Sequence, residues 1–308
     1  MSEQILVLFR KQLGDLLILQ PAISLLAERH QLPVRVFCRD GMDDLLSLMP
    51  GQVSRAGKWP QRYRAVFSFD PKPGATLYAA LARSREKHLL LTRRSFVRGW
   101  HRQIFDQFGF LEERQLYRGE IFYRLAGGLP ENFQPPRLNS PPADWSLPSL
   151  PENYVLIHPT AAWRQKCWDP ERWVAAVEPW CAGREWVITS GSAEWEVELA
   201  SRLASLLGQR AHNLAGKTSL RQYISLLHGA SAVLCVDGSA SHIAAAFGVP
   251  SLTLFGPSNA VQWHCPGPER LSVLAADHAP GSQPVLDALP VAPVRAALAL
   301  IFGEPKHD

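Results

Sequence analysis

The chain has 308 residues, of which 46% are hydrophobic and 19% are charged. That composition can bury a core and excludes an intrinsically disordered chain. At roughly 100–200 residues per domain, the length predicts about two domains. The balance of 32 basic against 28 acidic residues gives a net charge of +4. As an average over the chain, this charge is too small to indicate nucleic-acid or membrane binding.

Targeting and redox features predict a cytoplasmic protein. The apolar run 5–9 is followed at once by Arg10 and Lys11, and it is too short for the core of a signal peptide. No run approaches the roughly 18 apolar residues that a membrane-spanning helix needs. The five cysteines are scattered and odd in number, with no CxxC pair. They indicate a reducing compartment with neither a disulfide framework nor a zinc site.

Short apolar runs alternate with helical patterns along the whole chain. In the first half, the expected strands are 5–9, 34–38, 65–69 and 89–92, with a helix over 15–30. In the second half, the expected strands are 154–158, 186–189, 233–236 and 251–255, with helices over 171–182, 193–208, 219–229 and 240–247. Such strands are typical of a parallel sheet that is covered on both faces. Their alternation with helices predicts α/β units with right-handed crossovers.

A proline-rich stretch separates the two halves. Residues 130–151 contain seven prolines, and proline removes a backbone donor, so this stretch cannot continue a helix or a central strand. We interpret it as a semi-rigid linker between two doubly wound domains, 1–140 and 152–280. A closing helix is expected within 284–308, and it can pack back on the first domain.

The first motif directly follows the first expected strand. In doubly wound sheets, ligands bind beyond the carboxyl ends of the strands. Gly14 can turn the chain tightly there, and Asp15 can open the next helix. Asp15 is either a helix-capping aspartate or a general base at the mouth of a cleft. The motif contains no GxGxxG, so it is not a dinucleotide fingerprint.

The loop 158–168 follows the first expected strand of the second half. It carries a hydroxyl at Thr160 and cations at Arg164 and Lys166. Such a loop can hold a phosphate oxyanion, and the alternative is a solvated charged loop. Four nearby tryptophans are expected in the core rather than as sugar platforms: Trp168, Trp173, Trp180 and Trp186.

Small residues lie at another predicted junction between a strand and a helix. Asp237, Gly238 and Ser239 precede an alanine-rich helix, with His242 one turn further on. Small residues let a ligand approach the backbone, and the N–H groups of a helix start favour an anion. The alternatives are an ordinary helix cap and a core histidine.

A further loop, 189–194, contains Ser190, Gly191 and Glu194 after an expected strand. Glu194 can accept hydrogen bonds from ribose hydroxyls, or it can be an acidic residue of a first helical turn. Residues 255–259 also follow a strand, so they are either part of a ligand site or an ordinary turn. The chain has no phosphate loop of the GxxxxGK[ST] type, no GxSxG, no HExxH and no Asp-x-Asp.

Basic residues are concentrated in one region. Residues 83–102 carry seven basic residues against the single acid Glu86, with Phe96 and Trp100 interleaved. This pattern fits a solvated face, nucleic acid, an anionic sugar or an anionic lipid surface. We favour the binding of an anionic sugar, or docking on a membrane, by one cationic patch over nucleic-acid binding.

Together these motifs resemble glycosyltransferase family 9, the heptosyltransferases. The resemblance rests, in chain order, on 5–9 leading into Gly14-Asp15, on His158-Pro159-Thr160 with Lys166, on Val236-Asp237 with His242, and on Leu254-Phe255-Gly256-Pro257. It covers about residues 4–270. The segments around Lys166 and Gly216-Lys217-Thr218 are most similar to the heptosyltransferase III subgroup.

The resemblance implies a GT-B fold, in which an N-terminal acceptor-binding domain and a C-terminal donor-binding domain are both doubly wound. It implies an inverting transferase that moves heptose from ADP-heptose to the inner core of lipopolysaccharide, without a cofactor or a metal. The implied partners are that donor and that acceptor, with peripheral association on the cytoplasmic face of the inner membrane as an option and no nucleic acid. The rival interpretations are another GT-B transferase with a different nucleotide sugar and a non-catalytic sugar-nucleotide binding protein.

Residue roles follow from the resemblance position by position. Asp15 is the implied catalytic base, and Lys166 stabilises the leaving diphosphate. The implied donor-binding residues are Thr160, Lys166, Ser190, Gly191, Glu194, Thr218, Asp237, Gly238, Ser239 and His242. The expected acceptor-binding residues are Gly14, Arg93, Arg94 and Arg98. One departure is that Gly238-Ser239 stands where the family commonly has Thr-Gly, so Ser239 is expected to replace the threonine hydroxyl.

Overall fold

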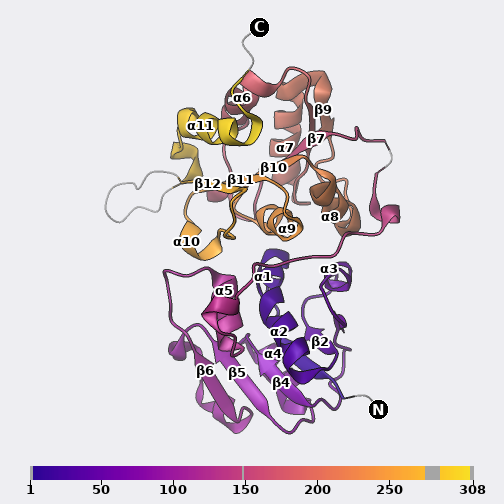
Figure 1. Ribbon diagram of the computed structural model, residues 1–308, viewed down its shortest axis with the longest axis vertical. Coiled ribbons are helices and arrows are strands. Elements are labelled where there is room, and N and C mark those ends of the chain that lie inside the picture. Colours follow the sequence, from indigo (N-terminus) through magenta and orange to yellow (C-terminus); the bar gives the residue numbers. More distant parts are fainter. Residues whose placement is uncertain (1–2, 148, 275–284, 306–308) are drawn as a thin grey trace. The chain divides into compact units, whose positions relative to one another are not determined.

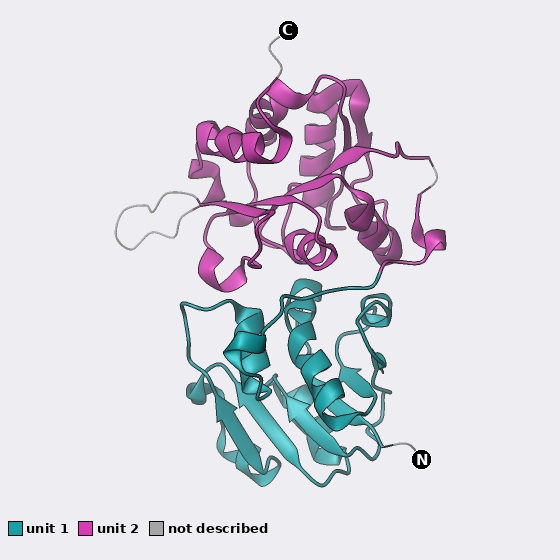
Figure 2. Cartoon of the chain, in the orientation of Figure 1, with its two compact units in different colours: residues 1–139 teal, residues 140–308 magenta. Residues whose placement is uncertain are grey.

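The computed structural model describes residues 3–147, 149–274 and 285–305. Within it the chain divides into two units, Met1–Asn139 and Ser140–Asp308 (Figure 2). This division falls inside the proline-rich stretch 130–151. Each unit is described by itself below.

The first unit is built on a parallel six-stranded sheet with the order β3-β2-β1-β4-β5-β6 (Figure 1). Its strands are β1 Ile5–Leu8, β2 Val34–Phe37, β3 Val53–Arg55, β4 Ala65–Ser68, β5 Lys87–Leu91 and β6 Gln107–Phe110. Every residue of β1 and β4 is buried, because both faces of a doubly wound sheet are covered. The strand order reverses between β1 and β4, where such folds bind ligands.

Helices cover both faces of this first sheet. They are α1 Leu13–Ile18, α2 Gln20–His30, α3 Asp43–Ser47, α4 Pro73–Leu81 and α5 Arg118–Leu125, with short 3-10 turns η1 Arg94–Phe96, η2 Gly99–Gln103 and η3 Pro130–Asn132. The single helix expected over 15–30 is therefore wrong. The ladder breaks at Leu19 because Pro21, in the first turn of α2, has no N–H to donate to the preceding turn.

The second unit has a parallel sheet of the same kind, with the order β12-β11-β10-β7-β8-β9. Its strands are β7 Tyr154–His158, β8 Glu185–Ile188, β9 Ala211–Asn213, β10 Ala232–Val236, β11 Ser251–Phe255 and β12 Arg270–Leu274. Its helices are α6 Pro170–Val177, α7 Glu194–Leu207, α8 Leu220–Gly229, α9 Ser239–Phe247, α10 Ala260–Trp263 and α11 Val291–Phe302, with 3-10 turns η4 Ala143–Trp145, η5 Arg164–Lys166, η6 Glu178–Trp180, η7 Gly208–Arg210 and η8 Leu286–Ala288.

The core of the second unit contains the tryptophans that the sequence analysis expected there. Trp168, Trp173, Trp180 and Trp186 all belong to one buried cluster. The rings of Trp168 and Trp173 meet edge to face at 5.3 Å, an arrangement that aromatic pairs prefer.

The closing helix α11 belongs to the second unit. It packs against α6, and Val294 and Leu298 are fully buried in that unit's core. The indole of Trp180 also donates to the carbonyl of Gly303, just beyond the helix, at 2.9 Å. The apolar face of this segment thus completes the core of the second unit.

The edge strands were not predicted from the sequence, and the reason is physical. β3, β6, β9 and β12 are half-exposed over most of their length. An edge strand has one neighbour and a thinner cover, so it needs no continuous apolar run. Only the central strands carry the apolar pattern that identifies a parallel sheet.

Candidate active site

Asp15 is the third residue of α1, in the loop and helix that follow β1. Its Oδ2 accepts a hydrogen bond from the backbone N–H of Gln12 at 3.3 Å, which closes the first turn of the helix. The side chain is half-buried, and Gly14 before it is buried. The two interpretations of Asp15 are thus compatible, because a capping carboxylate at the carboxyl edge of the sheet can also accept a proton.

Asp70, which the sequence analysis did not single out, fixes the loop that leads to Asp15. This fully buried carboxylate follows β4. Its Oδ2 accepts the N–H of Arg10 at 3.1 Å, and its Oδ1 accepts the N–H of Lys72 at 3.0 Å. It therefore ties the loops after β1 and β4 together. No motif could reveal this link, because the N–H of Arg10 lies 60 residues away from Asp70 in the chain.

Cations gather around Asp15. Arg39 donates to the side chain of Gln12 at 2.6 Å, beside the capped turn. Arg118 opens α5 and is half-buried. Burial lowers the pKa of Arg118, the nearby Arg93 lowers it further, and Asp15 raises it. Arg118 is thus a neighbour of Asp15 that the sequence analysis missed, because a lone arginine at a helix start carries no motif.

The basic residues of the region 83–102 lie before, within and after β5. Arg83 and Arg85 precede β5, and Arg93 follows it. A parallel strand rises about 3.3 Å per residue, so the extended β5 holds the two groups at opposite ends. Only the second group lies at the carboxyl edge of the sheet, where ligands bind.

The three arginines expected to bind acceptor, Arg93, Arg94 and Arg98, are all exposed after β5. The guanidinium of Arg94 lies over the ring of Phe110 at 4.8 Å, and that of Arg93 lies 5.9 Å from the ring centre of Phe96. Stacking of this kind limits side-chain freedom while leaving the N–H donors available.

In the second unit, Lys166 and Asp237 form a short ion pair. Lys166 Nζ lies 2.6 Å from Asp237 Oδ2, and the two side chains are only 19% and 7% exposed. Lys166 belongs to η5 after β7, and Asp237 follows β10, the neighbouring strand. The ammonium also lies 5.1 Å from the ring centre of Trp163. The structure thus joins two motifs that are 71 residues apart in the chain.

The start of α9 follows directly after Asp237. Gly238 is the N-cap residue, and the hydroxyl of Ser241 donates back to its carbonyl at 2.8 Å. The hydroxyl of Ser239 lies 3.4 Å from that of Tyr223. The first N–H groups of a helix have no partner within the helix, so this end favours an anion.

His242 is buried beneath that helix start. Among the described residues, its Nδ1 has no hydrogen-bond partner. Burial lowers the pKa of His242 to about 4, and the Asp237 carboxylate opposes this shift. The imidazole is therefore neutral at pH 7, and it is not the fully satisfied core histidine of the alternative interpretation.

Thr160 and Gly191 connect the ends of β7 and β8. Thr160 is fully buried, and its Oγ1 accepts the N–H of Gly191 at 3.4 Å. The hydroxyl of Ser190 donates to the carbonyl of Gly191 at 2.7 Å. Both hydroxyls thus shape the turn in which the sequence analysis expected donor contacts.

The acidic residue at this turn is Glu196, not Glu194. Glu194 is the first residue of α7 and is exposed. The carboxylate of Glu196 accepts the N–H of Ala193 at 3.4 Å and lies against Gly191, where a larger residue would collide with it. The N-cap residue Ala193 has no hydroxyl, so the Ser/Thr-x-x-Glu signature of a capping box is absent and the sequence carried no clear signal for Glu196.

The remaining predicted positions lie apart from the ion pair. Thr218 is half-buried in the loop after β9, two strands away from β7. Gly256, after β11, is packed so closely that an added Cβ would lie 2.8 Å from the backbone nitrogen of Leu286. Gly256 thus admits η8 to the core, a structural role.

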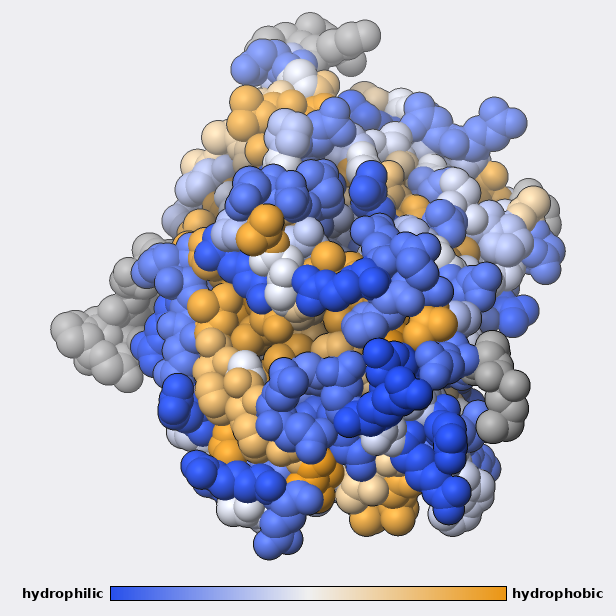
Figure 3. Space-filling view, turned by 60° about the horizontal axis from the view of Figure 1, so that its bottom comes forward, coloured by the Kyte–Doolittle hydropathy of each residue, from blue (hydrophilic) through white to orange (hydrophobic). Residues whose placement is uncertain are grey.

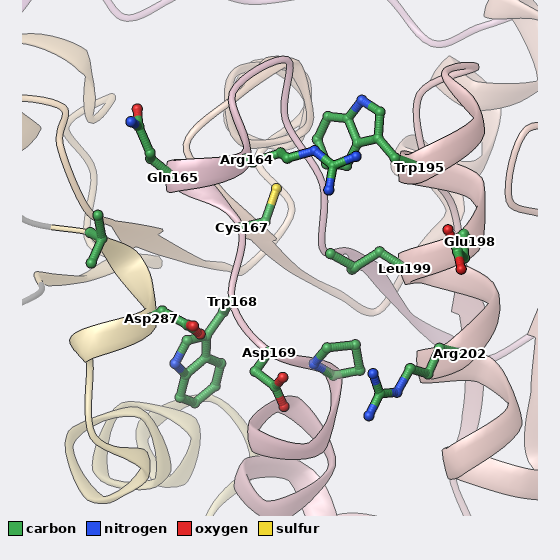
Figure 4. A pocket seen from close by; sticks show the side chains of 12 residues that line it. Arg164, Gln165, Cys167, Trp168, Asp169, Trp195, Glu198, Leu199, Arg202 and Asp287 are labelled. Carbon is green, nitrogen blue, oxygen red and sulfur yellow. The ribbon is translucent and has the colours of Figure 1, made fainter.

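A pocket of about 550 Å³ lies beside η5 in the same unit (Figure 4). Arg164, Cys167, Trp195 and Asp287 are among the residues that line it. The guanidinium of Arg164 lies 4.7 Å from the ring centre of Trp195. None of the predicted donor-binding residues lines this pocket. The pocket adjoins the site only through the neighbours of Lys166 in the turn η5.

In the part of the chain that the structure describes, no three histidine, cysteine or carboxylate side chains gather as metal ligands would. No helix in those residues is long and apolar enough to cross a membrane.

Comparison with known sequences supports the resemblance. A family model described as glycosyltransferase family 9 (heptosyltransferase) matches residues 131–283. Lipopolysaccharide heptosyltransferase 3 of Escherichia coli is 31% identical over 135 residues, which are 41% of this chain and 40% of that protein. Lipopolysaccharide heptosyltransferase 1 of Pseudomonas aeruginosa is 33% identical over 188 residues, 60% of this chain and 50% of that protein. The matches thus span half or less of these two curated relatives.

The fold is similar to that of a solved heptosyltransferase. The structure of Escherichia coli heptosyltransferase WaaC with ADP has a TM-score of 0.74 to this chain at 18% identity, covering 97% of this chain and 99% of that one. At this identity the similarity concerns the fold alone. Together with the two doubly wound sheets, it confirms the predicted GT-B class.

Proposed function

The chain belongs to glycosyltransferase family 9, and from this membership we propose that it is an inverting transferase that moves heptose from ADP-heptose to the inner core of lipopolysaccharide. The observation that carries the proposal is the 2.6 Å pair of Lys166 and Asp237 beside the start of α9. A nucleotide-sugar donor needs a cation and unpaired N–H groups in one place. ADP is the nucleotide named for the solved relative.

On the donor side, the leaving diphosphate gains negative charge as the bond to the sugar breaks. Lys166 and the N–H groups at the start of α9 would stabilise that charge, because they are held in place before the reaction. Asp237 holds the ammonium of Lys166 and keeps it at the helix start. Removing one preorganised donor of this kind typically raises a barrier by about 3–4 kcal/mol.

On the acceptor side, Asp15 would accept the proton of the attacking hydroxyl. The N–H of Gln12 donates to this carboxylate, and the guanidinium of Arg118 lies near it. The exposed Arg93, Arg94 and Arg98 would bind anionic groups of a core oligosaccharide. Gly14 would let the acceptor approach the backbone next to the base.

The remaining donor contacts are assigned by their place at the carboxyl edge of the second sheet. Ser239 and neutral His242 would contact the sugar phosphate, with Gly238 allowing close approach. Glu196 replaces Glu194 as the proposed ribose partner, because it lies at the Gly191 turn. The subgroup of heptosyltransferase III and a cytoplasmic site of action remain part of the proposal.

Nucleotide selectivity tests the donor assignment. A ligand at 100 times its Kd stabilises a protein by about 2.7 kcal/mol. Thermal unfolding with ADP, UDP and GDP is expected to show a clear preference for ADP. A preference for UDP or GDP would contradict the ADP-heptose assignment and favour a different nucleotide sugar.

Product formation tests the reaction itself. The chain would be incubated with ADP-heptose and truncated lipopolysaccharide cores, and the products would be read by mass. The expected product is heavier than the acceptor by one heptose residue. Binding of ADP without any transfer to these acceptors would leave a sugar-nucleotide binding protein as the better interpretation.

A further inference from the structure

Large hydrophobic side chains are exposed unevenly in the first unit. Among its described residues, six such side chains are exposed. Five of the six are Trp59, Leu77, Leu81, Phe96 and Trp100, of which Trp59 is 80% exposed and Leu77 61%. Figure 3 shows one face of the molecule coloured by hydropathy, with orange hydrophobic areas bordered by blue hydrophilic side chains. Exposed apolar groups that cluster mark interaction sites.

These five side chains come from three connections that cover the same face of the first sheet. The connections are 57–62 before β4, 71–83 with α4, and 94–104 before β6. We call them together the α4 surface. Side chains at or beside each connection pack into one core cluster beneath it, including Tyr63, Ala79 and Phe105.

Hydrogen bonds hold the three connections side by side. The hydroxyl of Tyr78 on α4 donates to the carbonyl of Gly57 at 2.7 Å. On the other flank, His101 Nε2 lies 3.2 Å from the carbonyl of Pro71, just before α4. Leu77 and Leu81 are four residues apart on α4, so both project from its outer side. The three connections that carry the exposed apolar side chains are therefore neighbours on this face.

The charge of the α4 surface has a single sign. Its three segments contain seven basic residues and no acidic residue. The basic residues are Lys58, Arg62, Lys72, Arg83, Arg94, Arg98 and Arg102. All seven are exposed. The net charge of this surface alone exceeds that of the whole chain, which is +4.

We propose that the α4 surface docks on an anionic lipid bilayer. Leucine and tryptophan side chains would enter the headgroup region, and the lysines and arginines around them would bind lipid phosphates. Tryptophan suits this boundary because its ring is apolar and its N–H is polar. A second copy of the chain is a poor occupant, because a twofold contact would set this cationic surface against itself.

The inference rests on the composition of the surface and not on the proposed reaction. Binding of the full chain to vesicles, measured by co-sedimentation without substrate, tests it. Vesicles of phosphatidylcholine with phosphatidylglycerol are expected to bind the protein, and those of phosphatidylcholine alone to bind it far less. Added salt should weaken the binding, because exposed charges are screened.

Variants locate the contact. Leu77→Ser with Leu81→Ser is expected to weaken vesicle binding roughly tenfold for each leucine. The matched control is Leu206→Ser with Leu300→Ser, which removes two exposed leucines from the second unit and should change nothing. Lys58→Gln and Arg102→Gln should each weaken binding about fivefold at low salt, whereas Arg137→Gln, elsewhere on the first unit, should not.

Several results would overturn the docking proposal. They are equal binding to neutral and anionic vesicles, an equal loss of vesicle binding in the control variants, and a change in oligomeric state when Leu77 and Leu81 are substituted. Binding of the protein to a nucleic acid, at a strength that the leucine substitutions do not change, would also overturn it. Transfer to a short soluble acceptor should stay unchanged in the leucine variant, which separates this inference from the proposed reaction.

Discussion

The two sheets present their carboxyl edges in different ways. In the second unit, Asp237, Thr160 and His242 at that edge are buried, and Asp237 and Thr160 are already bonded. In the first unit, Arg93 and Arg98 at the same edge are exposed. Buried, preorganised groups suit one fixed ligand, and long exposed cations suit a larger and more variable one. This contrast fits a donor site in the second unit and an acceptor site in the first.

The largest effect is expected for the base. Asp15→Asn keeps an oxygen for the N–H of Gln12 but cannot accept a proton, so kcat should fall about 10²–10⁴-fold. Thermal stabilisation by ADP should be unchanged, since the nucleotide belongs to the second unit. Transfer at the wild-type rate would remove Asp15 from the mechanism.

Lys166→Met tests the donor edge. It is expected to lower kcat by about 10²–10³ through loss of a preorganised donor. It also leaves the Asp237 carboxylate buried without its cation, which should destabilise the fold. Adding Asp237→Asn should recover stability but not activity. Arg164→Ala, in the same turn, is the control, and an equal loss of activity there would argue for a general effect on η5.

The lowered pKa values of two buried histidines predict how the free energy of unfolding depends on pH. Burial lowers the pKa of His158 and of His242 to about 4, below the ordinary value of about 6.5. The unfolded chain therefore binds more protons between these pH values. The free energy of unfolding should fall as pH drops from 6.5 toward 4, by up to about 3 kcal/mol for each histidine.

Denaturant unfolding of the protein and of His242→Asn across this pH range measures the effect. The variant should have a shallower pH dependence, and His212→Asn, a half-exposed histidine paired with Glu185, should keep the steep one. An unchanged slope in the His242 variant would mean that this imidazole is not neutral in the folded protein.

The acidic residue at the Gly191 turn gives a smaller effect. Glu196→Gln is expected to weaken ADP binding by about 1.5–3 kcal/mol, the worth of a hydrogen bond to a charged group. Glu194→Gln, two residues earlier and exposed, should leave it unchanged. Calorimetric titration with ADP compares the two variants, and the reverse ranking would restore Glu194 as the ribose contact.

The smallest effects are expected at the exposed arginines of the first unit. Exposed charge pairs are worth about 0–1 kcal/mol each, so Arg93→Glu should raise the KM for the acceptor only several-fold. The KM for the donor should not change. A larger change in the KM for the donor than in the KM for the acceptor would contradict the contrast between the carboxyl edges of the two sheets.

Local patterns were enough to predict much of the site. The apolar central strands and the small residues after them located Asp15, Lys166, Asp237 and His242 in loops at carboxyl edges. The same patterns missed Arg118 and Asp70, because each acts on a group far away in the sequence: Asp15 for Arg118 and the N–H of Arg10 for Asp70. Glu194 was chosen over Glu196 because the sequence does not say which acid of a first helical turn bends toward the preceding loop.

Local patterns along the chain are enough to predict the two doubly wound units, because an apolar run followed by a turn is a property of neighbouring residues. Tertiary structure decided which charges meet. It paired Lys166 with Asp237 across neighbouring strands, divided the cationic region 83–102 between the two ends of β5, and assembled the α4 surface from three separate connections. Charge acts through space rather than along the chain, so a net charge of +4 acquires a meaning only once the fold has placed each cation.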